Sequence, residues 1–455
     1  MLKPESRDNN DAVRRQAVEI IRRLRREGYD AYFVGGCVRD FIRKSVPDDY
    51  DIVTSALPEQ VMALFPRTVA VGVKFGIVAV VVHGHPYEVA TFRGDDVYID
   101  GRRPSSVHFS DSREDVLRRD FTVNGLLMDP ETGEIIDYIG GREDIEKRII
   151  RTIGDPDKRF NEDYLRMLRA VRFAANLNYE LDSATGEAIE RHSAKITRIS
   201  AERLQEELNK ILTRPGSRRG LELLARTKLL PEILPEVDRL QGVKQPPLFH
   251  PEGDVWQHTL LMLDMLPQER EPAEKRRLAW GVLLHDVGKA VTRTEDEKGI
   301  HFYGHVQAGE EIASGIMQRL KFSRLDREVV TDLIRCHMVF MNVQKMRKGR
   351  LKRFLRMPHF SLHLELHRLD CLASHSMLDN YEFCKDQLQL LAEEDLHPPR
   401  LLTGDDLIAL GYPPGKLMGE TLRALENMQL EGMIATREEA EKFVRDEWNK
   451  QAAAQ

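Results

Sequence analysis

The sequence predicts an α+β protein in which a mixed head is followed by a long, all-helical region. The prediction rests on where strand and helix signals fall along the 455 residues. Short runs of β-branched and aromatic residues, bounded by turn residues, are confined to roughly the first 150 residues. Beyond about residue 155, nearly every segment has the spacing of apolar residues that is typical of amphipathic helices.

The head begins with a predicted amphipathic helix over residues 11–27, which Gly28 would end. Strands are expected in the segments AYFVGG, DYDIVTS, FGIVAVVVHG and YEVATFR, with a short helix in PEQVMALF. The later segments NEDYLRMLRAVRFAANL, AERLQEELNKIL, RRGLELLARTKLL and WQHTLLMLDML all have helical periodicity. Proline-rich breaks near residues 240 and 398 mark boundaries, so we expect four parts: 1–150, 151–240, 241–397 and 398–455.

The composition excludes several classes of protein. No run approaches 18 apolar residues and the N-terminus is polar, so neither a membrane span nor a signal peptide is expected. The four cysteines are scattered, which argues against a disulfide framework and favours the cytoplasm. The net charge of −6 does not by itself suggest a nucleic-acid partner. Residues 341–360, however, hold seven Lys or Arg and no acid, so they form a solvated helix face or contact phosphates.

The stretch YFVGGCVRDFIRKSVPDDYDIVTS combines a glycine pair with two closely spaced aspartates. In a strand, Asp49 and Asp51 would lie on one face, where their mutual repulsion favours a divalent cation such as Mg²⁺. Gly35 and Gly36 would let the backbone approach a phosphate at the start of a helix, and Arg39 could reach a phosphate oxygen. The alternative is a strand, turn and helix with surface acids.

Two further clusters are rich in polar residues. The run VLRRDFTVNGLLMD places paired arginines, Asp120, Thr122 and Asn124 within an apolar segment, where they need partners. A triphosphate or ribose would supply these partners, and a structural ion-pair network around Asp120 is the alternative. Further on, Asp163 is followed by three arginines at intervals of three residues, which we expect to wind around one helix and to reach several parts of one ligand: Arg166, Arg169 and Arg172.

In this order and spacing, GGCVRD…DYD, RRDFTVN and EDYLRMLRAVRF resemble the class II tRNA nucleotidyltransferase/poly(A) polymerase family of the polymerase-beta superfamily. The resemblance covers about residues 30–235. It implies a nucleotidyltransferase head, a neck that selects the nucleotide and binds RNA, and a helical body and tail that hold tRNA. It also implies that Asp49 and Asp51 are catalytic metal ligands, and residues 92–117 resemble the flexible loop of the family. The implied nucleotide contacts, to which Gly35 is added from the turn argument, are Gly36, Arg39, Arg119, Asp163, Arg166, Arg169 and Arg172.

The expected reaction is addition of CCA, or part of it, to tRNA 3′ ends from CTP and ATP with release of pyrophosphate. C and A share an exocyclic amino group beside an unprotonated ring nitrogen, so Asp163 can accept from the amino group while Arg166 donates to the nitrogen. An enzyme that adds only the terminal A and a poly(A) polymerase remain alternatives within the family.

A second set of residues lies in the helical body. An adjacent His-Asp pair between apolar segments, with further histidines on neighbouring helices, resembles an HD-domain metal-dependent phosphohydrolase over about residues 250–375. The six metal positions that this resemblance implies are His258, His285, Asp286, His305, His337 and Asp370. Mixed nitrogen and oxygen ligands suit Mn²⁺, Ni²⁺, Fe²⁺ or Mg²⁺. A structural remnant, or an HD phosphohydrolase whose head merely binds RNA, are the alternatives. The substrate and the oligomeric state stay open.

Overall fold

The computed structural model describes residues 4–95, 107–391, 399–412 and 414–452. Part of the expected flexible loop, residues 96–106, lies outside these ranges. The chain divides into two compact units, Met1–Asp238 with Arg319–Lys321, and Arg239–Gln318 with Phe322–Gln455. Within the described ranges, no helix has both the length and the apolar character needed to cross a membrane.

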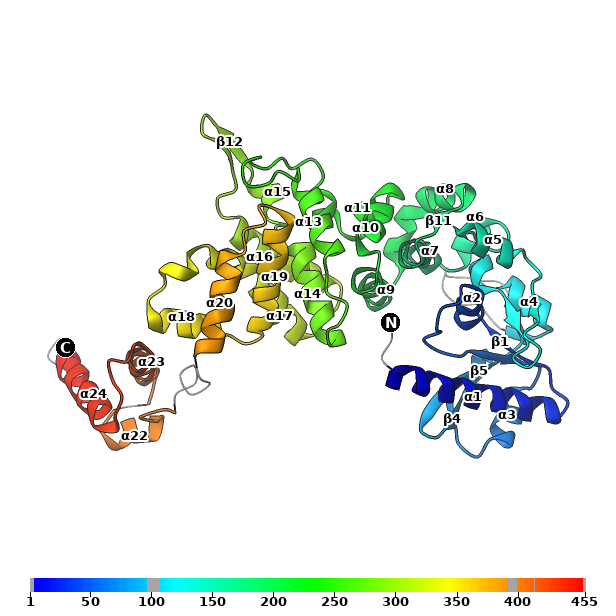
Figure 1. Cartoon of the computed structure of the whole chain (residues 1–455), viewed down its shortest axis with the longest axis horizontal. Coiled ribbons are helices and arrows are strands. Elements are labelled where there is room, and N and C mark those ends of the chain that lie inside the picture. The colour runs from blue at the N-terminus through cyan, green and yellow to red at the C-terminus, as the bar shows by residue number, and fades with distance from the viewer. Residues whose placement is uncertain (1–3, 96–106, 392–398, 413, 453–455) are drawn as a thin grey trace. The chain divides into compact units, whose positions relative to one another are not determined.

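A seven-stranded sheet, in the order β3-β4-β5-β2-β1-β8-β9, forms the framework of the head (Figure 1). Its neighbouring strands are antiparallel except for β2 and β5, which are parallel. Because β2 is in the middle of the sheet, the segment that leads into it is flanked by two other strands. The strands are β1 (Ala31–Val34), β2 (Ile52–Thr54), β3 (Thr68–Gly72), β4 (Ile77–Val82), β5 (His85–Thr91), β8 (Leu127–Met128) and β9 (Ile135–Ile136).

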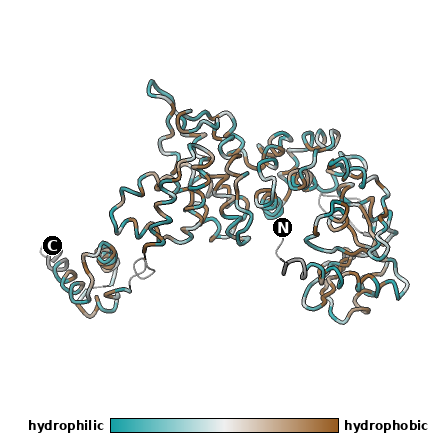
Figure 2. Tube along the Cα trace, viewed as in Figure 1, coloured by the Kyte–Doolittle hydropathy of each residue, from teal (hydrophilic) through white to brown (hydrophobic). Residues whose placement is uncertain are grey.

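Helices cover this sheet, and α1 (Pro4–Arg26) packs against it along the apolar face that the sequence predicts. Ala17, Ile20 and Leu24 on that face are buried. The hydrophobic residues follow the strands of the head and the inner faces of its helices (Figure 2). The other elements are α2 (Gly36–Ile42), α3 (Pro58–Leu64), η1 (Val73–Phe75), the hairpin of β6 (Arg93–Asp95) and β7 (Val107–Phe109), α4 (Ser112–Leu117), η2 (Thr122–Asn124) and α5 (Gly141–Lys147).

The first unit continues as a group of packed helices in which α7 (Leu165–Leu177) contacts both α9 (Ala201–Thr213) and α10 (Ser217–Arg226). Gly216 precedes α10 with a φ of +87°, and a β-carbon there would lie 2.4 Å from the carbonyl oxygen of Ala175. Only glycine therefore allows α10 to start this close to α7. The remaining elements are β10 (Ile149–Ile150), α6 (Pro156–Glu162), β11 (Glu180–Leu181), α8 (Ser183–His192), η3 (Ser193–Arg198), α11 (Leu230–Ile233) and α12 (Pro235–Asp238).

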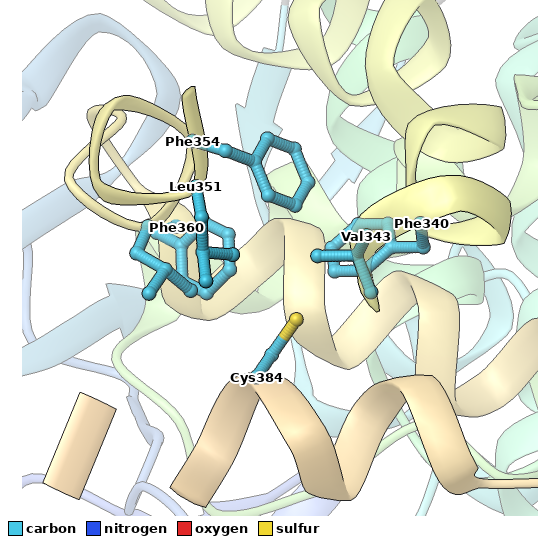
Figure 3. Close-up of a cluster of buried hydrophobic side chains, with 7 residues drawn as sticks. Phe340, Val343, Leu351, Phe354, Phe360 and Cys384 are labelled. Atoms are coloured by element: carbon cyan, nitrogen blue, oxygen red, sulfur yellow. The ribbon is translucent and has the colours of Figure 1, made fainter. Parts of the chain in front are cut away.

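The second unit is built mainly of helices. One of its cores gathers aromatic side chains around Cys384, and Figure 3 shows Phe340, Phe354 and Phe360 in it. The Phe340 and Phe354 rings meet edge to face with centroids 4.9 Å apart. Its elements up to residue 391 are α13 (Val255–Asp264), α14 (Pro272–Leu284), α15 (Lys289–Thr292), β12 (Thr294–Asp296), β13 (Gly299–His301), α16 (His305–Arg319), α17 (Arg324–Cys336), η4 (His337–Lys345), α18 (Lys348–Leu355), α19 (Phe360–Ala373) and α20 (Asp379–Leu390).

The tail has a small core of its own. Leu407, Tyr412, Leu425 and Val444 are buried together there. They come from α22 (Gly404–Ala409), α23 (Lys416–Glu431) and α24 (Arg437–Ala452) and from the loop between the first two.

The predicted α+β class is confirmed, with three differences in detail. The region beyond residue 155 is not entirely helical, because β11 pairs with β10 and β12 pairs with β13. The strand predicted in DYDIVTS begins only at Ile52, so Asp49 and Asp51 precede it. The helix predicted through Asp163 is broken there: α6 ends at Glu162 and α7 starts at Leu165, with Asp163 in extended conformation between them.

Candidate functional site

The structure brings the two aspartates of DYD together with the glycine turn. The main-chain N–H of Val34 in β1 donates to the carbonyl of Asp51 at 3.1 Å, which fixes the segment before β2 beside the end of β1. Gly35 follows β1 with a φ of +77°, a conformation that favours glycine. A β-carbon at Gly35 would lie 3.8 Å from Oδ2 of Asp51 and 3.9 Å from Nη1 of Arg119. The turn, the carboxylate and the arginine therefore face one another.

Burial and neighbouring negative charges raise the pKa of both aspartates. Burial, followed by the nearby charges of Asp49 and Glu88, raises the pKa of Asp51 to about 7. Burial, followed by Asp48 and Asp40, raises the pKa of Asp49. The chain thus holds ionisable oxygens where their negative charge is unfavourable unless a cation is present. This donor set suits a hard divalent ion.

Glu88 is a third acid of this site, and the sequence interpretation did not identify it. The register of β2 on β5 pairs Ile52 with Val89, which sets Glu88 beside Asp51. A cavity of about 240 Å³ is lined by these acids together with Asp49 and with apolar residues of β3 and β4. In the sequence, the one feature that pointed to Glu88 was its place between Tyr87 and Val89, which are both buried in β5 while Glu88 is exposed. Only the pairing of the strands shows that Glu88 faces Asp51.

The predicted arginine contacts all lie in the first unit, and each is engaged by protein groups. Arg39 donates from Nη1 to Oδ1 of Asn124 at 2.8 Å, and Nδ2 of Asn124 donates to Asp120 at 3.3 Å. Arg169 donates to Oδ2 of Asp120 at 2.8 Å. Against the opposing effect of desolvation, Arg169 lowers the pKa of Asp120 to about 2. The alternative of an ion-pair network around Asp120 is therefore realised, and it links α2, η2 and α7.

A second buried acid orients Arg119. Asp115 of α4 is fully buried and accepts from Arg119 at 2.9 Å and from Arg118 at 2.6 Å. These two guanidinium groups hold the pKa of Asp115 below its usual value, against the effect of burial. Arg119 is thereby held between Asp115 and Gly35, close to the catalytic candidates.

Asp163 lies at the junction of α6 and α7. Its Oδ1 accepts from the main-chain N–H of Leu165 at 3.0 Å, and its Oδ2 accepts from Arg203 at 2.8 Å. These two contacts fix the direction of the carboxylate, which the sequence interpretation had assigned to the interior of a helix.

The other two arginines of α7 are buried. Arg166 donates to the carbonyls of Arg159 and Arg118, at 3.2 and 3.1 Å, and pairs with Glu162. Arg172 pairs with the buried Glu207 at 2.5 Å. The three arginines of α7 thus point to different partners, as their 60° steps around the helix imply, whereas Asp163 lies before the helix.

In the second unit, the six residues implied by the HD resemblance converge on one buried cluster. Nε2 of His258 lies 3.1 Å from Asp370, and Nε2 of His285 lies 3.2 Å from Asp286. Oδ1 of Asp286 lies 3.9 Å from Nε2 of His305 and 3.8 Å from Nε2 of His337. Asp286 therefore belongs to two groups of potential metal ligands, one with His258 and His285 and the other with His305 and His337.

The donor atoms of this cluster are arranged to receive a metal. Nε2 of His258 and Nε2 of His285 are buried, and although carboxylate oxygens lie 3.1 and 3.2 Å away, neither nitrogen makes a well-aligned hydrogen bond among the described residues. Unpaired buried nitrogen atoms are unfavourable, and a bound cation would satisfy them. Lys289 approaches Asp286 at 2.7 Å and Gln245 at 2.7 Å. A cavity of about 280 Å³ lies over the cluster, and its apolar wall includes Phe249 and Phe302.

The basic run of residues 341–360 is partly engaged within the second unit. Lys352 is buried, Arg353 donates to Asn427, and Arg356 pairs with Glu426 at 2.5 Å. Four cations just before and at the start of α18 are exposed: Lys345, Arg347, Lys348 and Arg350. These exposed cations are the part of the run that could meet phosphate.

Known families match this chain in three consecutive segments: the Poly A polymerase head domain over residues 31–151, the probable RNA and SrmB-binding site of polymerase A over 178–241, and the HD domain over 255–367. A CCA-adding enzyme of Streptococcus thermophilus is 33% identical over 431 residues, 93% of this chain and 94% of its own length. The chain belongs to the CCA-adding enzyme family. The resemblance inferred from the three motifs is thereby confirmed, as is the HD domain.

Other family members match different shares of the chain. The CCA-adding enzyme of Geobacillus thermodenitrificans is 53% identical over 215 residues, which are 47% of this chain and 53% of that enzyme. The chain thus spans about half the length of several of the curated relatives it matches. The crystal structure of Bacillus stearothermophilus CCA-adding enzyme in complex with CTP has a TM-score of 0.74 and 28% identity, with full coverage of both chains.

The raised pKa of Asp51 predicts a pH-dependent effect of Asp51→Asn on stability. A carboxyl group whose pKa is about 7 in the folded protein and 3.8 otherwise destabilises the metal-free fold as the pH rises between these values. Asparagine does not ionise, so the variant should be more stable than the wild type at pH 8, by up to about 4 kcal/mol, and equally stable near pH 4.

Thermal unfolding in EDTA at several pH values measures this difference. Added Mg²⁺ should raise the Tm of the wild type at pH 8 and leave that of Asp51→Asn nearly unchanged. Equal Tm values at pH 8 in EDTA would contradict the repulsion described above.

Proposed function

We propose that this chain adds CCA, or part of it, to the 3′ end of tRNA, using CTP and ATP and releasing pyrophosphate. The observation that carries the proposal is the cluster of Asp49, Asp51 and Glu88 facing the Gly35 turn. Membership of the CCA-adding enzyme family and the similarity to a family structure in complex with CTP support it. In this proposal tRNA, CTP and ATP are the partners, and the protein works in the cytoplasm.

The proposed site residues of the head have different roles. Asp49 and Asp51, with Glu88 beside them, would hold Mg²⁺, which when bound activates a hydroxyl and neutralises triphosphate charge. Gly35 and Gly36 leave room for phosphate oxygens. The side chains that would bind the nucleotide are Arg39, Arg119, Asp163, Arg166, Arg169 and Arg172.

Selection of C and A is assigned to Asp163 and Arg166. Both side chains are fixed before a nucleotide arrives, Asp163 by Arg203 and Arg166 by two main-chain carbonyls. A fixed acceptor next to a fixed donor suits the amino group and ring nitrogen shared by C and A. U and G present a carbonyl and an N–H instead, so donor would meet donor and acceptor would meet acceptor.

We also propose that the second unit hydrolyses a phosphoester with a divalent metal bound by His258, His285, Asp286 and Asp370, and by His305 and His337 if two ions bind. The buried nitrogen atoms without well-aligned hydrogen bonds support this assignment. Mn²⁺, Ni²⁺, Fe²⁺ and Mg²⁺ are the candidate ions. The proposed domains are a head of residues 1–150, a neck of 151–240, an HD domain of 241–397 and a tail of 398–455. We also expect the exposed cations at the start of α18 to contact phosphate groups of the RNA.

Transcripts of tRNA that end before CCA, after C and after CC test the proposed activity. Each is incubated with labelled CTP or ATP, and the products are resolved at single-nucleotide resolution. Addition of C, C and A in turn would establish CCA addition. Extension of only the CC transcript would indicate an A-adding enzyme. Addition of long A tracts would indicate a poly(A) polymerase. If no transcript is extended, the head only binds RNA.

Asp49→Ala and Asp51→Ala should abolish nucleotide addition while leaving tRNA binding largely intact. Each substitution removes a carboxylate of the proposed metal site and no group expected to contact tRNA. Single-turnover addition and a filter-binding assay measure the two properties. Asp48→Ala is the matched control, because this neighbouring aspartate is 82% exposed and lies 3.7 Å from Arg214. If either variant adds nucleotides at more than a few per cent of the wild-type rate, the substituted residue is not a ligand of the catalytic metal.

Asp163→Ala should lower the preference for CTP and ATP over UTP and GTP by about tenfold or more, because an unpaired polar group costs about 1–3 kcal/mol. The overall rate should fall as well. Values of kcat/KM for the four nucleotides measure the ratio. Asp157→Ala is the control, since this acid of α6 pairs with Arg191 at 2.8 Å on the exposed side of α8. If kcat/KM falls equally for all four nucleotides, so that the preference for CTP and ATP is unchanged, Asp163 only supports the fold.

The double variant His285→Ala/Asp286→Ala should lose the metal of the second unit and retain nucleotide addition. Elemental analysis of the purified protein and hydrolysis of a panel of phosphoesters measure the loss. The control is His301→Ala/Asp296→Ala, which removes a His-Asp pair with a 3.0 Å contact on the β12–β13 hairpin. If the wild-type protein binds no metal in the second unit and cleaves no phosphoester of the panel, the HD domain has only a structural role.

A further inference from the structure

We propose that Glu252 is a positioning residue of the metal centre in the second unit. Its carboxylate fixes the ring of His258 so that Nε2 faces the metal, and it joins this ring to His250 in the wall of the cavity. The inference rests on the proposed role of His258 as a metal ligand.

One oxygen of Glu252 receives two imidazole N–H groups. Nδ1 of His258 lies 2.7 Å from Oε1, and Nδ1 of His250 lies 2.9 Å from the same atom. The Glu252 side chain is only 6% exposed, and its Oε2 has no hydrogen-bond partner among the described residues. A carboxylate is rarely buried without a cation or several donors around it, so the two imidazoles account for its position.

The backbone before α13 is shaped to present Glu252 to His258. Asp254 caps the helix by accepting from the N–H of Gln257 at 2.8 Å, and His258 lies at the end of the first turn. Gly253, between Glu252 and the cap, has a φ of +128°, which a residue with a β-carbon rarely adopts. The main-chain N–H of Gly253 donates to the carbonyl of His250 at 3.4 Å, and in the turn that this bond closes Glu252 reaches His258 of the helix that follows.

His258 differs from the other three histidines of the cluster in what holds its ring. His285, His305 and His337 all donate Nδ1–H to main-chain carbonyls three residues earlier in the chain, at 2.9, 2.8 and 2.6 Å. His258 alone donates to a carboxylate. A carboxylate is the stronger acceptor, and it increases the basicity of the opposite nitrogen and hence its strength as a metal donor.

The same three side chains could instead hold an ion of their own, since His250, Glu252 and His258 form a compact group. The hydrogen-bond distances argue for positioning. Both Nδ1 atoms already face Oε1 at hydrogen-bond length, and a metal there would occupy the nitrogen of His258 that must carry a proton if Nε2 is to bind the main cluster. The number of bound ions distinguishes the two arrangements.

The test uses the full chain with Asp49→Ala and Asp51→Ala, so that the head carboxylates do not bind the probe. Mn²⁺ is titrated into the metal-stripped parent and into Glu252→Ala, Glu252→Gln, His250→Ala and the control Glu269→Gln by isothermal calorimetry. Glu269 is an exposed acid just beyond α13. Circular dichroism and thermal unfolding without metal establish that each variant is folded.

We expect Glu252→Ala to weaken Mn²⁺ binding by about 10–100-fold with an unchanged number of ions. Glu252→Gln keeps an acceptor for His258 but loses the charge, so its affinity should fall between those of Glu252→Ala and the parent. His250→Ala removes one of the two donors to Glu252 and should weaken binding less than Glu252→Ala, whereas Glu269→Gln should bind like the parent. The ligand-field spectrum of the Co²⁺-loaded protein should also change in Glu252→Gln, because a less basic His258 is a weaker donor.

Three outcomes would overturn the inference. Parental affinity in Glu252→Ala would show that the carboxylate does not act through His258. Loss of one ion from the stoichiometry would make Glu252 a ligand rather than a positioning residue. Equal losses in Glu252→Gln, Glu252→Ala and His250→Ala would indicate a general disturbance of the loop. Absence of Mn²⁺ binding in the parent and the control alike would instead contradict the metal centre itself.

Discussion

The ion pair between Asp120 and the partly exposed Arg169 holds the nucleotide-binding candidates in one arrangement. Asp120 accepts from Arg169 at 2.8 Å, from the N–H of Phe121 at 2.8 Å and from Asn124 at 3.3 Å, and Asn124 in turn accepts from Arg39. The Arg169 side chain is 34% exposed, so water partly screens this ion pair, and the importance of Asp120 lies in joining several donors at once. The relative positions of α2, η2 and α7 therefore depend on this one carboxylate, although it is not itself a proposed nucleotide contact.

The head and the HD domain use different ligand chemistry. The head gathers only carboxylates beside a glycine turn, which suits a hard ion that keeps open positions for water and phosphate. The second unit combines imidazoles with two aspartates, a set that accepts several transition metals. Each set of side chains lies within one unit, and no residue belongs to both. The two proposed metal sites therefore share no ligand, and a substitution in one set of ligands leaves the other set unchanged.

Much of this arrangement was readable from the sequence, and what was missed has a physical reason. Gly35, Asp49 and Asp51 all lie in the short segment between β1 and β2, so local reasoning could predict that they meet. Glu88 joins them only through the parallel pairing of β2 with β5, which is a tertiary contact. The break at Asp163 was missed because the apolar periodicity runs on through the junction of α6 and α7.

The HD cluster shows the same limit. Its histidines and aspartates are distinctive residue types on helices, and the adjacent His285 and Asp286 drew attention to them. Glu252 lies in a loop two residues before a helix cap, where a glutamate is ordinary. Only its hydrogen bonds to His258 and His250 in the folded chain show that it faces inward.

The hairpin between β4 and β5 restricts how this chain can diverge. The two strands pair from Ile77 with Ala90 to Val82 with His85, and the two-residue turn of His83 and Gly84 has φ values of 49° and 84°. Side chains alternate between the faces of a strand, so one residue gained or lost here would move Glu88 away from Asp51 and bring Tyr87 or Val89 beside it. Insertions and deletions in this turn are therefore restricted by the position that Glu88 must keep beside Asp51, just before the neighbouring strand, so the length of a surface turn helps to preserve the acidic cluster.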